Sequence, residues 1–222
     1  MADYRMIETD TWPRYQRFVH FTEDAPCAVW LTDDIDVTEL VDGVRTSGKP
    51  FYPSMLYCVS KVINAHEEFR LTSVDSPLFP KPMPAVWDLV HPSHNVFRQD
   101  SETFVNIFTL YTDDPVKFID NCTLDIEKAV SSAPGDIPCP SNIFEASCVP
   151  WRGFTSVGSV QEAYPLSPIV VWGRYGNSPD GRIVMPLSIQ INHACADGYH
   201  LARFISEAEA AAADLGRLLR TK

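Results

Sequence analysis

An alternating segment near the C-terminus, continued by a long amphipathic run, most constrains how this chain can fold. Apolar and polar side chains alternate along residues 182–193, as in Leu187 and Ser188, which predicts a half-buried strand. Residues 198–220 carry apolar side chains at the spacing of one helical face. Burying both apolar faces together predicts a helix packed on a sheet. His193 occupies the position where the strand's next apolar side chain is expected.

The rest of the chain mixes strand-like and helix-like segments without regular alternation. Helices are predicted over 37–47 with Asp36 as cap, from Tyr52 to about 70, and from Pro115 to about 130. Strands are predicted at 26–36, 84–93, 102–112, 143–151 and 167–175, with a proline-rich loop at 132–142 and a turn at 176–182. We predict one domain over residues 1–222, an α/β (α+β) two-layer sandwich with helices packed on a mixed sheet.

Charge and cysteine usage exclude several classes of function. Lysine and arginine number 18 against 29 acidic residues, a net charge of −11, so no basic stripe is available for nucleic acid. A small phosphorylated ligand held by one or two local cations remains possible. No apolar run approaches the ~18 residues of a membrane span, and the N-terminus carries no secretory h-region. Six scattered cysteines without a CxxC pair predict reduced thiols and a cytoplasmic protein.

The segment between the predicted strand and the last helix concentrates reactive side chains. His193 precedes Asp197 and Gly198 by the spacing HxxxDG. Asp197 has an ordinary interpretation as the cap of the helix, and His193 one as a hydrogen-bonded core histidine. A metal site formed with His200 is a further alternative, although these residues span a corner and do not share one helix face.

Motifs along nearly the whole chain resemble the trimeric chloramphenicol acetyltransferases. The family signature HHxxCDGxH matches Asn192 to His200 with HxxxDG intact, although Asn192 replaces the first histidine and the cysteine is displaced. Dihydrolipoyl acyltransferase cores share HxxxDG, so the other motifs narrow the resemblance. The stretches that resemble family motifs are KPFYPSMLYCVSKVINAHEEFR, VWDLVHPSHNVFRQDSETF, SCVPWRGFTS and MPLSIQINH.

The resemblance implies a catalytic group of four residues. His193 matches the general base that takes a proton from an acceptor hydroxyl as it attacks the thioester of acetyl-CoA, a task suited to imidazole. Ser147 matches the serine that donates to the tetrahedral oxyanion. Asp197 matches a structural aspartate whose arginine partner would be Arg14. Cys195 raises a rival in which a thiol, activated by His193, forms an acyl-enzyme.

The resemblance also assigns binding residues. Acetyl-CoA is implied as a co-substrate, with no permanently bound cofactor and no metal. Its arm would be flanked by Tyr52, Trp151, Arg174 and Tyr175, and the acceptor by His20, Phe21, Cys27, Val29, Phe104, Asn106 and Val157. A family tyrosine is Phe21 here, and a family phenylalanine corresponds to Pro134. Several ring contacts are therefore lost, each costing roughly 1 kcal/mol.

The function implied is acetyl transfer to a hydroxyl, with chloramphenicol as the leading acceptor. The alternatives are another alcohol or amine acceptor, a non-catalytic binding protein, or the acyltransferase core of a dehydrogenase complex, which a missing lipoyl domain disfavours. The resemblance implies a homotrimer with active sites between subunits, and neither a membrane nor nucleic acid as partner. In that arrangement the apolar strand face that leads to His193 would be buried against the neighbouring chain.

Overall fold

A seven-stranded mixed sheet forms the frame of the protein. The computed structural model describes residues 3–75, 81–131, 138–160 and 165–221, so the predicted Pro134 position and most of its loop lie outside the described residues. The strand order is β2-β10-β8-β7-β5-β6, with β9 pairing β10. The strands are β2 (Ala28–Asp36), β5 (His91–Arg98), β6 (Thr103–Phe108), β7 (Ile143–Val149), β8 (Ile169–Gly173), β9 (Gly176–Asn177) and β10 (Ile183–Asn192). Pairing of β7 with β5 and β8 is parallel and the other pairs are antiparallel, which confirms the mixed sheet.

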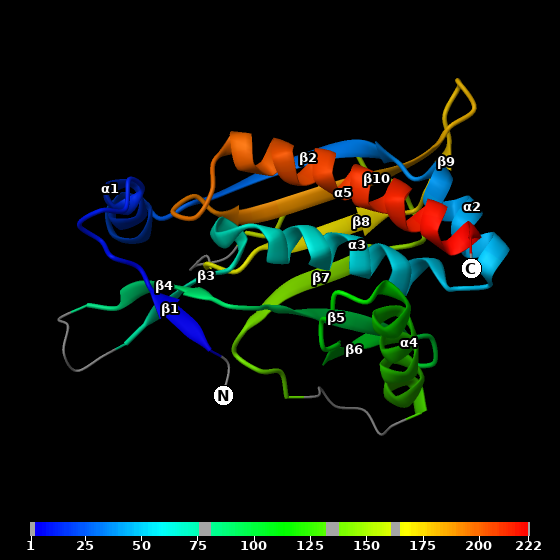
Figure 1. Ribbon diagram of the computed structural model, residues 1–222, viewed down its shortest axis with the longest axis horizontal. Helices are drawn as coiled ribbons and strands as arrows, with labels where there is room; N and C mark the ends of the chain where they lie inside the picture. Colours follow the sequence, from blue (N-terminus) through cyan, green and yellow to red (C-terminus); the bar gives the residue numbers. More distant parts are fainter. Residues whose placement is uncertain (1–2, 76–80, 132–137, 161–164, 222) are drawn as a thin grey trace.

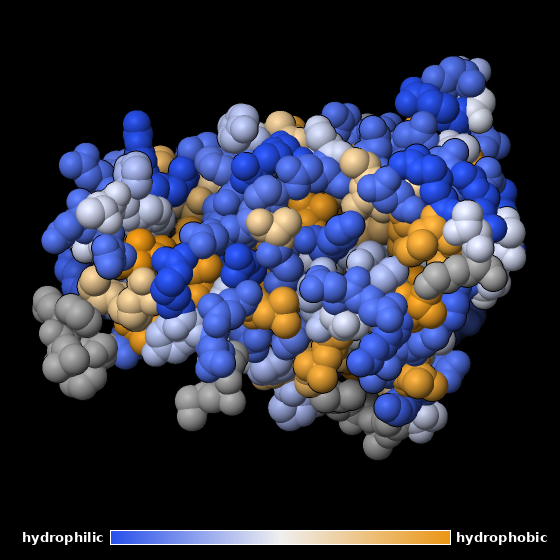
Figure 2. All heavy atoms as spheres, viewed as in Figure 1, coloured by the Kyte–Doolittle hydropathy of each residue, from blue (hydrophilic) through white to orange (hydrophobic). Residues whose placement is uncertain are grey.

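Helices cover one face of this sheet and form the second layer of the fold (Figure 1). They are α2 (Thr38–Ser47), α3 (Phe51–Ala65), α4 (Pro115–Ser131) and α5 (Gly198–Arg220). The core between the layers holds Trp172 from β8, Phe144 from β7 and Phe204 from α5, all essentially inaccessible to water. The surface on this side is mostly hydrophilic with separate apolar patches (Figure 2).

The central strand β10 is buried on both faces, so the prediction of a half-buried strand was wrong. Its apolar side chains, such as Leu187, belong to the same core as those of α5, within one chain and without a neighbour. The polar face is covered by the segment after β7. Ser188 donates to the carbonyl of Val157 at 3.0 Å, and the Gln190 amide accepts from and donates to the backbone of Ser159, both at 2.7 Å. These bonds satisfy polar groups that burial would otherwise make costly.

The predicted strand 84–93 is two strands in two different sheets. β4 (Met83–Trp87) ends where the Arg70 guanidinium binds the carbonyls of Trp87 and Asp88, and β5 begins only at His91. β4 belongs to a separate three-stranded sheet, in the order β1-β4-β3. Its other members are β1 (Tyr4–Met6) and β3 (Leu71–Val74). The chain therefore leaves one sheet and enters the next at a point where the sequence reads as continuous.

Helix starts follow the predicted capping residues closely but not completely. Asp36 lies one residue before the N-cap of α2, and its carboxylate accepts the N–H of Thr38 at 2.9 Å. Asp114 accepts the N–H groups of Val116 and Lys117, which opens α4 at the predicted proline. No pattern in the sequence predicted α1 (Tyr15–Val19) or the π-helical turn His20–Asp24 that continues it. No helix in the described ranges is long and apolar enough to cross a membrane.

Candidate active site

A tight turn between β10 and α5 carries the predicted base. The N–H of His193 donates to the carbonyl of Cys27 at 2.9 Å, just beyond the last pair of the β2–β10 ladder. The Asn192 side chain accepts the N–H of Ala194, and its carbonyl accepts the N–H of Cys195, both at 2.9 Å. The chain turns at this point, so His193 lies past the end of the strand and does not continue its core-facing row.

The hydrogen bonds of His193 fix which ring nitrogen is basic. Nδ1 lies 3.0 Å from the carbonyl oxygen of Ala196 and 3.3 Å from Oδ1 of Asp197. A carbonyl only accepts, so Nδ1 carries the proton and neutral imidazole keeps its lone pair on Nε2. The side chain is 25% exposed, and the ring of Phe21 stacks on it at 4.0 Å between centroids. Partial exposure excludes the interpretation of His193 as an ordinary core histidine.

Arg14 holds this turn from the N-terminal segment. Its guanidinium donates to Asp197 at 2.7 and 2.9 Å, to the carbonyl of His193 at 2.8 Å and to that of Ala194 at 2.7 Å. The hydrogen bond from Arg14 lowers the pKa of Asp197 below its ordinary value, so the carboxylate stays ionised at neutral pH. The predicted pair is therefore present, and the same arginine also binds the backbone that carries the imidazole.

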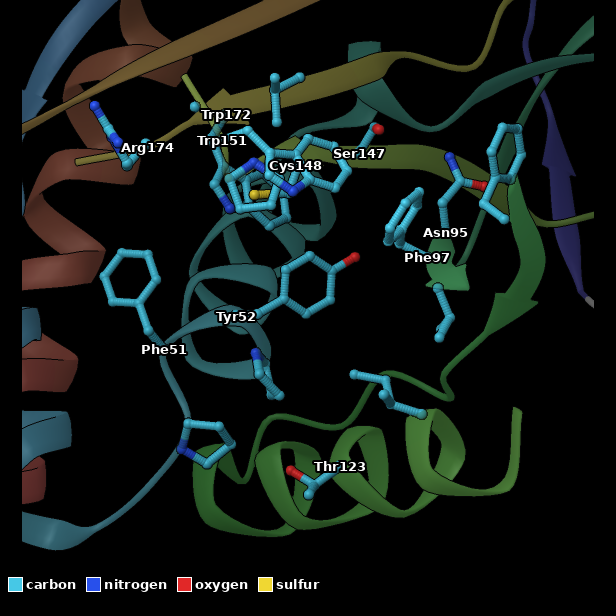
Figure 3. A pocket seen from close by; sticks show the side chains of 18 of the residues that line it. Phe51, Tyr52, Asn95, Phe97, Thr123, Ser147, Cys148, Trp151, Trp172 and Arg174 are labelled. Carbon is cyan, nitrogen blue, oxygen red and sulfur yellow. The ribbon is translucent and has the colours of Figure 1, made fainter. Parts of the chain in front are cut away.

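A second group of predicted residues lines a pocket of about 1000 Å³ between the sheet and helices α3 and α4. Figure 3 shows Tyr52 projecting from α3 into this pocket, with Ser147 and Trp151 on the opposite side. Six predicted residues share its walls: Tyr52, Phe104, Ser147, Trp151, Arg174 and Tyr175. The structure thus brings together all four residues that the resemblance assigns to acetyl-CoA, and adds the serine assigned to the oxyanion.

Aromatic side chains dominate the walls of this pocket. Phe51 packs against Tyr175 at 4.9 Å between ring centroids, and Tyr52 lies 5.3 Å from Trp172. Burial raises the pKa of Cys148 to about 12, so its thiol stays neutral there. Arg174 supplies a positive charge at one end (Figure 3). The pocket suits an extended, largely apolar chain with an anionic terminus.

Within one chain, the two groups lie far apart. Ser147 on β7 is opposite Val171 on β8, which is opposite Ser188 on β10. His193 lies five residues beyond Ser188, about 17 Å along the strand and about 10 Å across two strand spacings, roughly 20 Å in all. No hydroxyl can meet both His193 and Ser147 of the same chain.

The residues predicted to bind the acceptor divide in the same way. Phe21 and His20 pack together beside His193, Cys27 binds its backbone, and Val29 is opposite Ile191 in the β2–β10 ladder. Phe104 and Asn106 are four strands away on the edge strand β6. Val157 lies with the segment that covers β10, where its carbonyl accepts from Ser188.

Comparisons with known proteins agree over almost the entire chain. The family model described as "CAT: Chloramphenicol acetyltransferase" matches residues 2–209. A chloramphenicol acetyltransferase of Streptomyces acrimycini is 36% identical over 94% of each chain, and one of Vibrio anguillarum is 34% identical over 92% of each. The chain belongs to the chloramphenicol acetyltransferase family. It is therefore an acyltransferase by family.

Solved structures extend the likeness of the family fold. A chloramphenicol acetyltransferase structure superposes with a TM-score of 0.77 at 22% identity, covering 95% of this chain and 98% of its own. A dihydrolipoamide acetyltransferase of Azotobacter vinelandii follows at a TM-score of 0.67 and 18% identity, covering 92% and 88%. At these identities the likeness concerns the fold alone. It confirms the predicted two-layer arrangement of the family.

Two rival interpretations of the signature are not supported by the geometry. Cys195 is fully buried, its thiol lies against the carbonyl of Leu166 at 3.5 Å, and burial raises its pKa to about 12, which makes it a poor nucleophile. His200 is used in the start of α5, where its Nδ1 accepts the N–H of Asp197 at 3.0 Å. Across the described ranges, no three His, Cys, Asp or Glu side chains gather as a metal site would require.

Sequence reasoning missed His94, which lies directly behind the family tyrosine Tyr52. Its Nδ1 is 3.2 Å from the Tyr52 hydroxyl, and the side chain is fully buried on β5. The only sequence signal was a second histidine within the strand-like segment HPSHNVF, and the partner of His94 is 42 residues away in the chain. Such a pairing depends on how α3 packs on the sheet.

Proposed function

We propose that the protein transfers the acetyl group of acetyl-CoA to a hydroxyl of chloramphenicol. The single observation that carries this is the tautomer of His193: Nδ1–H is committed to the carbonyl of Ala196, which leaves Nε2 as the base. Nε2 takes the hydroxyl proton while the oxygen attacks the thioester carbonyl carbon. The tetrahedral intermediate then collapses, the C–S bond breaks, and the imidazolium returns the proton to the CoA thiolate.

Ser147 is proposed to stabilise the oxyanion of that intermediate. Its place in the wall of the pocket, near Tyr52 and Trp151, supports a hydroxyl donor at the thioester end of a bound acetyl-CoA. A donor of this kind contributes roughly 2.7–4 kcal/mol of transition-state stabilisation. Arg174 would meet a phosphate of the cofactor, and the aromatic walls would hold its pantetheine arm.

We propose that the active unit is a homotrimer in which His193 of one subunit faces Ser147 of the next. The separation of roughly 20 Å within one chain supports this, because neither group alone completes the chemistry. Large aromatic side chains stand exposed on or near the strands that carry the two groups: Trp30 at 51%, Phe104 at 58% and Trp151 at 56%. Exposed apolar surface of this size is typical of a protein interface.

One observation supports an alcohol or amine other than chloramphenicol as the alternative acceptor. Asn106 accepts from Ser93 at 2.9 Å and donates to Asn95 at 3.3 Å, so a polar cluster stands beside the pocket on β5 and β6. Such a cluster suits a hydrogen-bonding acceptor better than a nitrophenyl ring. A ligand-binding protein without turnover would gain nothing from the base geometry of His193.

Thiol release from acetyl-CoA, with and without chloramphenicol, tests the chemistry directly. Thiol release that depends on chloramphenicol and disappears in His193→Ala supports the proposal. If His193-dependent release occurs only with another alcohol or amine, the proposed chemistry holds but the acceptor is that compound and not chloramphenicol. If no acceptor in a broad panel causes thiol release although the protein still binds CoA, the alternative of a non-catalytic binding protein is favoured. Expression in a sensitive bacterium, scored by growth on chloramphenicol, tests antibiotic resistance. A cytoplasmic location is proposed because the six cysteines are scattered along the sequence without a CxxC pair, a pattern typical of reduced thiols.

The shared site is tested by coexpressing His193→Ala and Ser147→Ala, each inactive alone, under two affinity tags. Each mixed trimer places an intact His193 opposite an intact Ser147 in one of its three sites, so trimers purified through both tags should regain roughly a third of wild-type activity. Ser206→Ala, an exposed serine on α5, is the matched control for Ser147→Ala. No recovery in trimers purified through both tags would show that both residues act from one chain.

A further inference from the structure

A chain of buried polar groups continues from Tyr52 away from the pocket. The Tyr52 hydroxyl is 3.2 Å from Nδ1 of His94, whose Nε2 is 3.1 Å from the hydroxyl of Thr109. Thr109 in turn donates to Oδ2 of Asp125 at 3.1 Å. These four residues come from α3, β5, the segment after β6, and α4, and both middle members are fully inaccessible to water.

The carboxylate at the far end sets the direction of every proton in this chain. Asp125 is partly exposed, its carboxylate forms an ion pair with the Lys128 ammonium at 3.8 Å, and carboxylate oxygens only accept hydrogen bonds. The single hydroxyl proton of Thr109 therefore points to Asp125. The thiol of Cys122 is also within hydrogen-bond reach of Thr109, but a neutral thiol is a weaker hydrogen-bond acceptor than a carboxylate.

The direction then passes through His94 to Tyr52. Burial lowers the pKa of His94 to about 4, so the ring is neutral at pH 7 and carries one N–H. Because the Thr109 oxygen is left to accept, that N–H is on Nε2, and Nδ1 has only a lone pair. The Tyr52 O–H must therefore donate to His94, which leaves lone pairs of its oxygen for the pocket.

We propose that His94 is a positioning residue that holds the Tyr52 hydroxyl proton toward itself and away from the pocket. The Tyr52 oxygen then acts only as an acceptor in the pocket and selects an amide N–H of the ligand. A phenol without such a partner can either donate or accept, and selects neither. On the proposed function, which this inference deepens, the ligand is acetyl-CoA, and its pantetheine arm carries two amide N–H groups. Tyr52 lies in the middle of the aromatic walls that would hold this arm (Figure 3).

Isothermal titration calorimetry with CoA and two ester analogues tests the assignment, each analogue having an oxygen in place of one pantetheine amide N–H. The wild type should bind one analogue about two- to tenfold more weakly than CoA, the worth of one hydrogen bond. His94→Phe and Tyr52→Phe should bind that analogue and CoA equally well. His94→Asn should restore the preference, because its side-chain oxygen stands near the position of Nδ1 and accepts the tyrosine proton.

A structural role alone would weaken both ligands together and leave their ratio unchanged. Melting curves followed by circular dichroism check that each variant is folded. Should His94→Phe fail to fold, Thr109→Val is the second variant: it frees the His94 tautomer and should also abolish the preference. This inference alone is overturned if folded His94→Phe still prefers CoA to the ester analogue as strongly as the wild type does, or if the wild type shows no such preference. Failure of the wild type to bind CoA overturns the proposed function as well.

Discussion

Removing the Arg14 guanidinium tests whether the turn that carries His193 is held by this residue. We consider Arg14→Met, which keeps most of the side-chain stem and removes all donors. Four hydrogen bonds are lost: two to the Asp197 carboxylate and one each to the carbonyls of His193 and Ala194. Arg17→Met is the matched control, because Arg17 is an exposed arginine three residues further on, within α1.

The expected loss follows from the exposure of each partner. The Arg14 side chain is only 16% exposed, so its two charge-assisted bonds to backbone carbonyls contribute roughly 1.5 kcal/mol each. Asp197 is 47% exposed, and solvent screening limits that ion pair to about 0–1 kcal/mol. The sum is roughly 3–4 kcal/mol, or about a 10 °C fall in Tm for a chain of this size.

Urea unfolding and steady-state kinetics at one protein concentration measure the two consequences. Because the freed carbonyls belong to the turn that aims the imidazole, kcat should fall by roughly 100-fold, as expected for a displacement of about 1 Å. Arg17→Met should change neither quantity. A loss of stability below about 1 kcal/mol with unchanged kcat would refute the view that Arg14 holds the base.

Four further outcomes are expected. The stabilisation from Asp197, whose pKa Arg14 lowers, is complete above the ordinary carboxyl pKa of about 3.9 and is lost as pH falls through the lower folded-state value. Urea titrations of wild type and Asp197→Asn should therefore converge in acid. Ser147→Ala should lower kcat by about 100- to 1000-fold in thiol-release assays, with little change in folding. Gly43→Ala should destabilise by about 1–3 kcal/mol in urea, since its Cβ would meet the Gly216 carbonyl oxygen at 2.4 Å and force α2 from α5. Cys195→Ala should stay active, and the native thiol should resist a thiol reagent at pH 8, because its pKa is about 12.

Local patterns in the sequence predicted elements well where side-chain period and capping agree. Asp114 followed by Pro115 marked the start of α4, and the alternation before His193 marked β10. Each of these signals consists of residues that are close neighbours in the sequence, so no tertiary information is needed to read it. The break at Asp88 could not be read in this way, because it depends on Arg70 binding backbone carbonyls from another part of the chain.

The candidate site was predictable as a set of residues through the family resemblance, but not as an arrangement. No local pattern shows that His193 and Ser147 lie on different parts of the sheet, since that follows from the strand order β10-β8-β7. The buried chain behind Tyr52 has the same origin: it joins residues separated by 15 to 42 positions through packing of α3 and α4 on β5. Contacts of this range are set by topology.

Phe21 provides the last test, of the side of His193 where the acceptor is proposed to bind. Its ring contacts the base but does not line the cofactor pocket. It lies in a π-helical turn, a geometry common at functional sites, and its ring covers one face of the His193 imidazole at 4.0 Å. Phe21→Tyr introduces the residue that the family resemblance places there, and Phe21→Ala removes the ring.

Both variants should leave CoA affinity unchanged, since the predicted CoA residues lie on other elements. Phe21→Tyr should alter KM for the acceptor at constant kcat, whereas Phe21→Ala should also lower kcat because the imidazole loses a packing partner worth about 0.5–1.5 kcal/mol. Steady-state kinetics with each acceptor separates the two results. A change in CoA affinity without a change in acceptor KM would instead assign Phe21 to the cofactor side, and the proposed division of the site would be wrong.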